Sequence, residues 1–466
     1  MSLTAPFWSD GRTRDLASNV SIPAMTAKAE VLLVNPWIYD FAAYNLWIEP
    51  LGLLVIAAAL RDSGYGVTVI DCLAPYPGGP GAHRDGSGKF SKTIVPKPDA
   101  VAFVPRHFGR YGLPMERFEA ALTYIPRPDV ILVASGMTYW YPGVAEVIRR
   151  IRAKFGGVPV ALGGIYATLC YEHAQERSGA DRVVRGPGMV EALRLTAEWT
   201  GHRCVAERFT DPHTWPLAAR DLVLRPFAGI VTSWGCPYRC TYCASHRLQP
   251  AFVRRKPTDV VEEMRGCVVS GIRDLAFYDD ALLLDPERHI VPILEGIVRL
   301  GLPVRLHAPN GLHAQAVTPE LARLMQRAGF TTIRLSLETT DRDRQRSSGG
   351  KVTTDDFVRA TAHLRAAGFG PDQLGAYILA GLLDQPLEEV EAAIRFVHQL
   401  GVQAKLALFS PIPGTVDGDR ALASGADPLL HNNTVYPYLL GAEYVRNLQR
   451  VKLLAKEGNL ALVADG

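Results

Sequence analysis

Two series of short apolar runs, alternating with stretches of helical periodicity, divide the chain into two parts. Runs of β-branched and aliphatic residues predict the strands of the first series at 31–34, 67–70, 130–134, 158–162 and 182–184. Apolar residues that recur every three or four positions predict its helices at 51–63, 142–155, 167–177 and 189–199. This alternation predicts an α/β fold with a parallel, doubly wound sheet, which binds ligands beyond the carboxyl ends of its strands.

The second series begins after residue 227 and has six βα-type units. Its strands are predicted at 229–233, 274–278, 304–307, 332–337, 374–379 and 404–409. Its helices are predicted at 257–270, 286–300, 318–328, 353–367 and 386–400. Six units are too few to close an eight-unit barrel, and in βα barrels the catalytic groups lie at the carboxyl ends of the strands.

Less regular segments surround these two predicted domains, which span 29–200 and 228–415. We expect residues 1–28 to be a disordered lead-in, because they are polar and lack periodicity. The remaining irregular segments are a Gly-, Pro- and aromatic-rich insertion or cap at 72–128, a Pro-containing linker at 201–227, and a C-terminal helical extension at 416–466.

Composition excludes several classes of protein. Hydrophobic residues make up 48% of the 466 residues, and 50 Lys and Arg against 47 Asp and Glu give a net charge of +3. This balance indicates neither nucleic acid nor an anionic membrane as the main partner. The longest apolar stretch, 51–60, is shorter than the roughly 20 residues of a membrane span. Seven cysteines, three of them crowded, indicate a reduced, cytoplasmic setting rather than a disulfide framework.

The crowded cysteines carry the strongest chemical signal. Cys236, Cys240 and Cys243 directly follow the first strand of the second series, with three and two residues between them. Three thiolates at this spacing can converge on one iron–sulfide cluster. Electron-transfer clusters normally take four cysteines, so one iron would stay open, as a catalytic metal site requires. The alternatives are a structural zinc held by the same cysteines and His246, or unrelated reduced thiols.

With Tyr242 before the last cysteine, this run resembles the signature of the radical S-adenosylmethionine (SAM) superfamily, whose core is a partial (β/α)6 barrel. The resemblance implies a [4Fe-4S] cluster whose open iron binds the amino and carboxylate groups of SAM. One electron passed to the sulfonium then yields methionine and a 5′-deoxyadenosyl radical, which abstracts hydrogen from an unactivated carbon. It also implies a small-molecule substrate and an electron donor such as flavodoxin or ferredoxin.

The same resemblance assigns SAM contacts to the strand ends. Tyr278, Asp279 and Asp280 stand where members often carry Gly-Gly-Glu, so the Tyr278 carbonyl is expected to bind the ammonium with one aspartate facing the pocket. Asp280 is equally expected to cap the following helix. Ser336 and Glu338, on one side of their strand, are assigned the SAM carboxylate or ribose. Arg334 on that side is expected to be core-facing or salt-bridged. The other assigned SAM contacts are Tyr242, Tyr377, Gly381 and Pro411.

The strand exits of the first domain include Asn35-Pro36, Ser135-Gly136-Met137-Thr138 and Gly163-Gly164. In these the domain resembles the cobalamin-binding domain that precedes the barrel in one large radical SAM subgroup. Glycines at its strand ends let a large ligand approach the backbone. The histidine motif Asp-x-His-x-x-Gly is missing, since Asp211-Pro212-His213 lacks the glycine, so a histidine below the corrin is not implied. The alternative is a degenerate domain that only dimerises or shapes the substrate site. The resemblance assigns cobalamin contacts to Asn35, Ser135, Met137, Gly163, Gly164 and Gly186.

These features together predict a cobalamin-dependent radical SAM enzyme that methylates an unactivated carbon. A methyl group carried by cobalamin would be donated, and a second SAM would restore it. The alternatives are radical cyclisation, rearrangement or oxidation without methyl transfer, or a non-enzymatic zinc or iron–sulfur binding module. Because methyl transfer needs corrin, substrate and radical in one cavity, we expect the carboxyl edge of the first sheet to face the mouth of the barrel.

Overall fold

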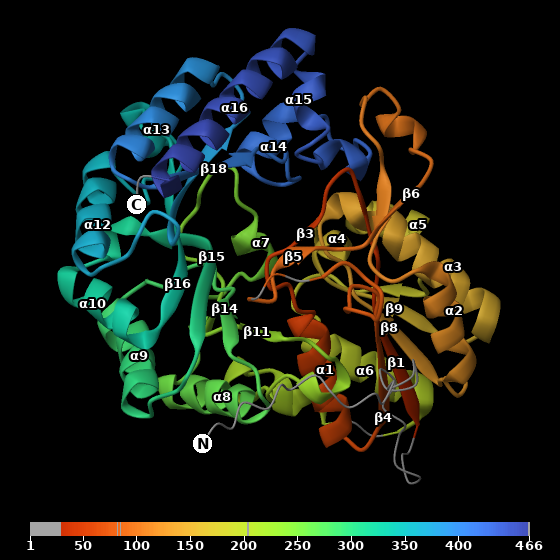
Figure 1. The fold of residues 1–466 in the computed structure, drawn as a ribbon. Coiled ribbons are helices and arrows are strands. Elements are labelled where there is room, and N and C mark those ends of the chain that lie inside the picture. Colours follow the sequence, from red (N-terminus) through yellow and green to blue (C-terminus); the bar gives the residue numbers. More distant parts are fainter. Residues whose placement is uncertain (1–28, 82, 84, 203–204, 465–466) are drawn as a thin grey trace.

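Two α/β units lie side by side in the computed structural model, which describes residues 29–81, 83, 85–202 and 205–464 (Figure 1). The predicted lead-in at 1–28 lies outside the described residues. The first unit runs from red to yellow in Figure 1, and the partial barrel follows in green and cyan. The C-terminal helices, in blue, lie against the barrel and reach the first unit, as the contact between the 3₁₀ turns η3 (Thr138–Trp140) and η9 (Pro428–His431) confirms.

The first unit is a parallel sheet covered by helices on both faces. Within the described residues its strand order is β10-β9-β8-β1-β4, so the chain winds outward from β1 in both directions. The predicted doubly wound sheet is confirmed. Helices α1 (Leu51–Asp62) and α6 (Met189–Thr200) pack on one face, and α3 (Tyr141–Phe155) packs on the other. The strands are β1 (Glu30–Asn35), β4 (Gly66–Asp71), β8 (Val130–Val133), β9 (Val160–Leu162) and β10 (Arg182–Val183).

The segment predicted as an insertion or cap includes a helix that belongs to the first α/β unit itself. Helix α2 (Met115–Tyr124) buries Phe118 and Leu122 in the core of the first sheet, so it is the crossover helix between β4 and β8. Helix formation here follows from the packing of this apolar face rather than from the Gly- and Pro-rich context. The rest forms small antiparallel sheets from β2 (Ile38–Asp40), β3 (Tyr44–Asn45), β5 (Gly88–Lys89), β6 (Lys92–Ile94) and β7 (Gly109–Tyr111). The helix predicted at 167–177 is likewise two, α4 (Ile165–Leu169) and α5 (Tyr171–Arg177), because Cys170 leaves the helical region at φ −126°.

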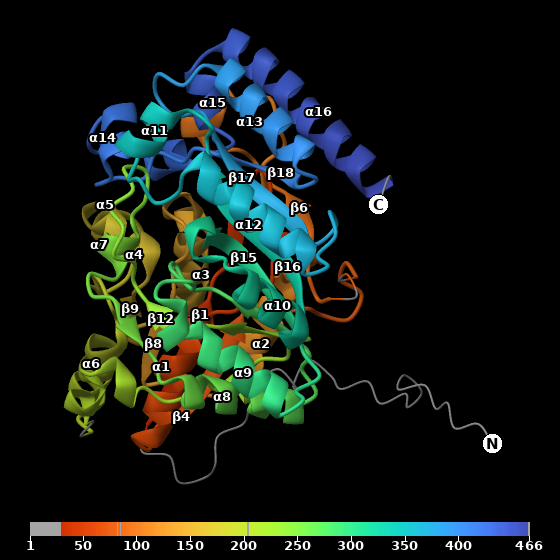
Figure 2. The same cartoon turned by 90° about the vertical axis from the view of Figure 1, so that its left-hand side faces the viewer.

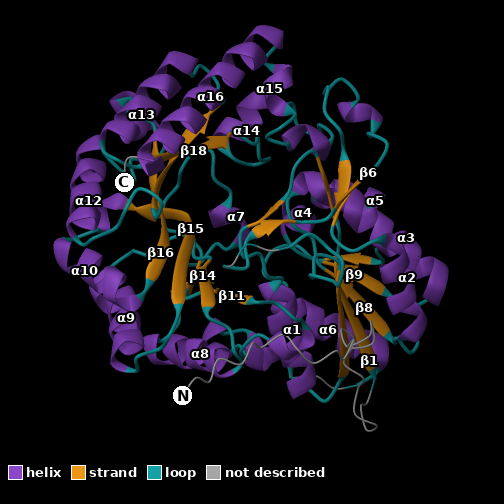
Figure 3. Cartoon of the chain, viewed as in Figure 1, coloured by secondary structure: helices purple, strands orange, loops and turns teal. Residues whose placement is uncertain are grey.

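The second unit is a six-stranded parallel sheet in sequence order, which confirms the predicted partial barrel. Figure 3 shows its helices along the outer face of the strands. Alternation sends Ile333, Leu335 and Ala376 outward into the helix-covered core, which leaves their neighbours on the inner face. The strands are β11 (Phe227–Ile230), β14 (Asp274–Phe277), β15 (Arg305–His313), β16 (Phe330–Glu338), β17 (Leu374–Ala380) and β18 (Gln403–Leu408). The helices are α8 (Pro257–Val269), α9 (Ile290–Arg299), α10 (Pro319–Ala328), α12 (Thr354–Ala366) and α13 (Leu387–Gln399).

The C-terminal segment covers the open edge of this sheet. Helix α16 (Ala442–Ala464) lies along α13 and β18 (Figure 2). The Asn459 side-chain amide accepts a hydrogen bond from the Ala404 N–H (2.7 Å) and donates one to the Ala404 carbonyl (2.9 Å). An edge strand otherwise presents such groups unpaired. The predicted helical extension therefore covers the β18 edge of the barrel sheet. No helix in the described part of the chain combines the length and apolar character that a bilayer crossing needs.

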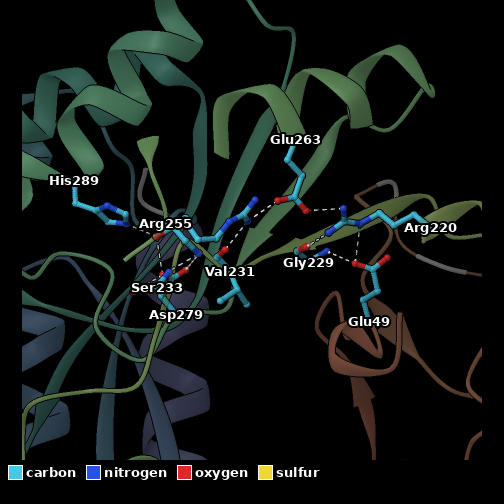
Figure 4. A network of polar contacts seen from close by, with 10 residues as sticks. Glu49, Arg220, Gly229, Val231, Ser233, Arg255, Glu263, Asp279 and His289 are labelled. Atoms are coloured by element: carbon cyan, nitrogen blue, oxygen red, sulfur yellow. Dashed lines mark hydrogen bonds and ion pairs between the residues drawn. The ribbon is translucent and has the colours of Figure 1, made fainter. Parts of the chain in front are cut away.

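A buried ion network joins the two units (Figure 4). The Glu49 carboxylate accepts hydrogen bonds from Arg220 (3.1 Å) and from the Gly229 N–H of β11 (3.0 Å). Arg220 also pairs with Glu263 (2.6 Å), which pairs with Arg255 (2.5 Å). The described part of the predicted linker that follows residue 204 thus packs between the units. Its buried charges fix the start of the barrel relative to the first sheet.

Candidate functional site: a cysteine loop facing a glycine-lined cavity

The three cysteines lie on the loop between β12 (Ser233–Trp234) and the short helix α7 (Ser245–Leu248). Cys240 is buried, and the other two are half-buried. Burial raises the pKa of the Cys236 thiol to about 11. A Cβ added to Gly349 would lie 3.0 Å from the Cys240 Cα and 3.1 Å from its Sγ. The loop after α11 (Arg342–Ser347) therefore packs directly against the cysteine loop, and only glycine fits there.

The three thiols of this loop are the candidate ligands of the predicted metal centre. Across the described residues, no three His, Cys, Asp or Glu side chains are placed to hold a single metal ion. A four-iron cluster is larger than one ion and separates its cysteines more widely. Three neighbouring thiols on one loop fit such a cluster, with one iron left open.

Asp279 anchors the strand end that precedes this loop, which corrects the expectation that it faces the SAM pocket. Its carboxylate accepts hydrogen bonds from the N–H and hydroxyl groups of Thr232 and Ser233 at 2.6–3.1 Å. His289 Nε2 lies 2.8 Å from the Thr232 hydroxyl (Figure 4). Burial raises the pKa of Asp279, whereas the Thr232 and Ser233 hydrogen bonds lower it. With all its partners inside the protein, this side chain positions the cysteine loop.

Tyr278 connects the two units rather than serving the barrel alone. The Asn310 side-chain amide donates to the carbonyls of Tyr278 (3.1 Å) and Asp279 (3.2 Å). The Tyr278 hydroxyl donates to the Leu46 carbonyl of the first unit. Asn310 was not assigned a role from the sequence; it lies within β15, which continues past the predicted strand end at residue 307 to His313.

Ser336 and Glu338 converge on a lysine that the sequence did not single out. Lys351 Nζ lies 2.9 Å from a Glu338 carboxylate oxygen and 3.2 Å from the Ser336 hydroxyl. A β-bulge shifts the register between these two strand residues, and Glu338 has φ +67°, a strained value that clusters at functional sites. Burial lowers the pKa of Lys351, but the charge and hydrogen bond of Glu338, together with Cys240 and Cys243, outweigh it, so the pKa is raised. Lys351 lies on the loop after α11, away from any strand end, so no pattern marked it.

The remaining predicted SAM contacts lie at the ends of β17 and β18. The Tyr377 hydroxyl donates to the Pro309 carbonyl (2.6 Å). This hydrogen bond crosses over β16 and connects β17 with β15. Gly381, at φ +102°, donates its N–H to the Gln385 side chain (3.0 Å), and Pro411 is buried just beyond β18. Tyr242 packs with residues of both strand ends and lies under Lys351, whose Nζ is 5.8 Å from its ring centre.

A cavity of about 600 Å³ lies at the carboxyl ends of the first sheet, and all six residues assigned to cobalamin line it. Tyr278 of the barrel lines it too. A Cβ at Gly163 would have only the Val184 Cβ within 4.0 Å, so that glycine faces open space. Gly164 differs, because a Cβ there would lie 2.3 Å from the Ser135 carbonyl oxygen; this glycine permits close backbone packing. The cavity and its open glycine fit a large planar cofactor. Its lining residues are Asn35, Ser135, Met137, Gly163, Gly164 and Gly186, among others.

The cavity and the cysteine loop face each other. Helix α4, which begins after Gly164, packs against α7, which follows Cys243. The carboxyl edge of the first sheet therefore faces the mouth of the barrel, as the sequence predicted.

Fold and site together define a radical SAM domain preceded by a corrinoid-type domain, and family comparisons agree. Residues 230–397 match the model of the radical SAM superfamily, and residues 109–194 match the B12 binding domain. The chain belongs to the radical SAM superfamily, in the cobalamin-dependent subgroup that carries this domain. The cofactors that this membership implies are a [4Fe-4S] cluster, SAM and cobalamin.

Individual proteins are similar at low identity. An uncharacterized methyltransferase of Pyrococcus horikoshii is 26% identical over 64% of this chain and 70% of its own length. Hopanoid C-3 methylase of Methylococcus capsulatus is 23% identical over 83% of this chain and 71% of its own. Among solved structures, the radical SAM methyltransferase TsrM of Kitasatospora setae superposes with a TM-score of 0.62 at 17% identity, covering 87% of this chain and 85% of that one. At that identity the structural match establishes the fold.

Proposed function

We propose that this enzyme transfers a methyl group from SAM, by way of cobalamin, to an unactivated carbon of a small molecule. One observation carries the proposal: the glycine-lined cavity and the cysteine loop face each other, with Tyr278 reaching from the barrel into the cavity wall. A methyl carrier and a radical source must act on one substrate carbon, and this arrangement brings their sites together. The methyltransferases and methylases among the relatives support the same reaction class.

When bound, cobalamin supplies a methyl carrier, and the cluster supplies the electron that cleaves SAM. The chain's own residues bind and orient these groups. We assign Cys236, Cys240 and Cys243 to the cluster. Lys351 offers a positive charge to the SAM carboxylate, held in place by Glu338 and Ser336. Asp279 and His289 act indirectly, because they hold the strand end from which the cysteine loop starts.

The experiment needs no knowledge of the substrate. Anaerobically reconstituted protein, loaded with hydroxocobalamin, is given a low-potential reductant and SAM labelled with deuterium in its methyl group. We expect S-adenosylhomocysteine in an amount that matches the corrinoid, with the labelled methyl recovered on the corrinoid by mass spectrometry. Protein without corrinoid is the control and should form none. Abundant 5′-deoxyadenosine with no S-adenosylhomocysteine in the loaded protein would contradict methyl transfer.

That last outcome would instead favour the second candidate, radical cyclisation, rearrangement or oxidation without methyl transfer. The same cavity arrangement accommodates it, because a corrinoid beside the radical source need not carry a methyl group. Product analysis separates the two candidates, because only methyl transfer converts SAM both to S-adenosylhomocysteine and to 5′-deoxyadenosine.

A further inference from the structure

A second cavity, of about 610 Å³, opens on the inner face of the barrel sheet. Arg334, His307 and Tyr377 line it from the strands, and Trp47 of the first unit lines it from above, stacked on His307 with ring centres 4.0 Å apart. Arg334 lies two residues before Ser336 on the same face of β16. At about 3.3 Å per residue, it lies about 7 Å deeper along the strand than the Ser336–Lys351–Glu338 group. The cavity thus continues the barrel interior below the expected SAM site.

Two neighbouring cations on the inner face of the barrel sheet, Arg334 and Lys405, have no counter-ion within the described part of the chain. Among the residues that the structure describes, neither Arg334 nor Lys405 forms an ion pair; the Arg334 guanidinium donates to the Ile333 and Gln373 carbonyls, and Lys405 donates to the Gln403 side chain. The salt bridge that the sequence suggested for Arg334 is therefore not found among the described residues.

Neighbouring cations are paired, so this is not a general property of the barrel interior. Arg305, which lines the same cavity, is bonded to Asp274, and Lys351 is bonded to Glu338. Two carboxylates, Asp85 and Asp372, also line the cavity. Within the described part of the chain, neither is within ion-pairing distance of the two unpaired cations, and Asp85 accepts hydrogen bonds from Ser87 instead.

Gly375 holds the two cations side by side. On one side of β17, Arg334 pairs in register with Gly375; on the other side, Lys405 of β18 pairs with Tyr377, two residues further along β17. A Cβ on Gly375 would lie 3.0 Å from the Arg334 guanidinium and 3.1 Å from the Lys405 stem, so the missing side chain leaves room for both. Burial and then the charge of Arg334 lower the pKa of Lys405 to about 8. Like charges in a partly desolvated site repel each other until an anion joins them.

We propose that Arg334 and Lys405 bind an anionic group of the substrate, a carboxylate or a phosphate, inside the barrel. An arginine with its planar donor fork beside a lysine is a common pair for such groups. The substrate's anionic end would then lie deep in the barrel, with its reacting carbon about 7 Å nearer the cysteine loop. That the anion belongs to the substrate rests on the proposed function, whereas the anion site itself can be tested alone.

The test measures protection of Lys405 from acetylation in the full reconstituted chain. Acetic anhydride at low dose is applied with inorganic phosphate in one arm and with acetate in the other, at ionic strength matched by sodium chloride, and each lysine is quantified by peptide mass spectrometry. We expect at least one anion to slow acetylation of Lys405 threefold or more while exposed lysines change less than 1.5-fold. The arm with the larger effect identifies the anion class.

Variants establish the role of the pair. Arg334→Gln should abolish the protection, Arg334→Lys should keep part of it, and Arg299→Gln, which removes an exposed arginine of α9, should leave it unchanged. Equal protection in Arg334→Gln, or no protection in the wild type, would overturn the anion site. Protection without S-adenosylhomocysteine formation would leave the site standing and reject methyl transfer. The reverse pattern would reject the site and leave methyl transfer standing.

Discussion

The thiols of the cysteine loop are positioned by the residues packed around them as well as by their spacing in the sequence. Cys240 is buried against Gly349, and the Thr241 N–H donates to the Ser348 carbonyl at 3.1 Å, so the loop after α11 fixes the middle of the cysteine run. Three cysteines are the minimum for the proposed cluster, which leaves no ligand to spare.

Replacing any one of Cys236, Cys240 and Cys243 by Ala should therefore prevent stable cluster assembly. Iron and sulfide are measured after anaerobic reconstitution, together with 5′-deoxyadenosine release. Cys170→Ala, which removes a half-buried thiol of the first unit, is the matched control and should keep both. A loop variant with a full four-iron complement and SAM cleavage would contradict the assignment.

Glu338 and Lys351 form a half-buried ion pair, and we expect it to bind SAM. Replacing Lys351 by Met should lower SAM affinity roughly ten- to a hundredfold, because a charged hydrogen bond contributes about 1.5–3 kcal/mol and 1.4 kcal/mol is tenfold in binding. Glu338→Gln should have a similar effect, since the lysine then loses the partner that orients it. Equilibrium binding to the reconstituted protein measures both.

The control for that pair is Glu295→Gln, on the exposed face of α9. It should bind SAM as the wild type does. If Lys351→Met lowered only the melting temperature and left SAM affinity unchanged, the pair would be structural.

At the scale of elements, the turn between β9 and α4 forms the wall of the first cavity. Its two glycines have different structural roles: Gly164 permits close backbone packing on Ser135, and Gly163 leaves the cavity open. A bulky residue at Gly164 would distort the backbone and could not report on the cofactor alone. Gly163 is therefore the informative position.

Gly163→Val should remove the corrinoid and leave the iron intact, because the added carbons enter the cavity without meeting the backbone. Corrinoid content is measured by absorbance after loading and gel filtration, and iron is measured in the same sample. Gly266→Val, at an exposed position of α8 with open space around it, is the matched control and should retain both. Full corrinoid retention in Gly163→Val would exclude this cavity as the binding site.

At the scale of the whole molecule, the C-terminal segment joins the barrel to the first unit. Asn432 donates to the buried Asp40 carboxylate (2.8 Å), which also accepts from Trp140 in the cavity wall (2.7 Å). His431 lies 3.0 Å from the Thr138 hydroxyl in the same turn. The segment thus supports the cavity wall from outside.

This contact makes stability depend on pH. Burial lowers the pKa of His431 to about 4, from an ordinary 6.5. Below pH 6.5 the unfolded chain takes up a proton that the folded chain refuses, so the contribution of His431 is fully present above pH 6.5 and is lost as the pH falls toward 4. One pKa unit corresponds to about 1.4 kcal/mol, so the loss reaches a few kcal/mol at most.

We expect His431→Gln to lose less stability than the wild type between pH 7 and pH 4.5. Chemical denaturation at a series of pH values measures this difference. His213→Gln, at an exposed histidine of the linker, should keep the wild-type pH dependence. Parallel curves for His431→Gln and the wild type would show that His431 is not the group responsible.

The sequence by itself determined the two sheets, their order and the chemical class. Strand and helix periods depend on neighbouring residues, and the cysteine spacing lies within eight positions, so both can be detected locally. The resemblance of Cys236–Cys243 and of the glycine-containing strand exits to known motifs extended this to the cofactors, and the six assigned corrin contacts indeed share one cavity.

Only the tertiary structure decided which polar side chains remain available to a ligand. Asp279 was expected in the SAM pocket but forms its hydrogen bonds with Thr232 and Ser233. Lys351 and Arg334, in contrast, became candidate ligand-binding residues only in the structure. Lys351 lies on a loop without a sequence pattern, and Arg334 has no counter-ion among the described residues. Whether a charge is neutralised depends on partners far along the chain, as Glu49 and Arg220 illustrate at 171 residues apart. Local periodicity carries no information about such partners, because they meet only when the two sheets have packed.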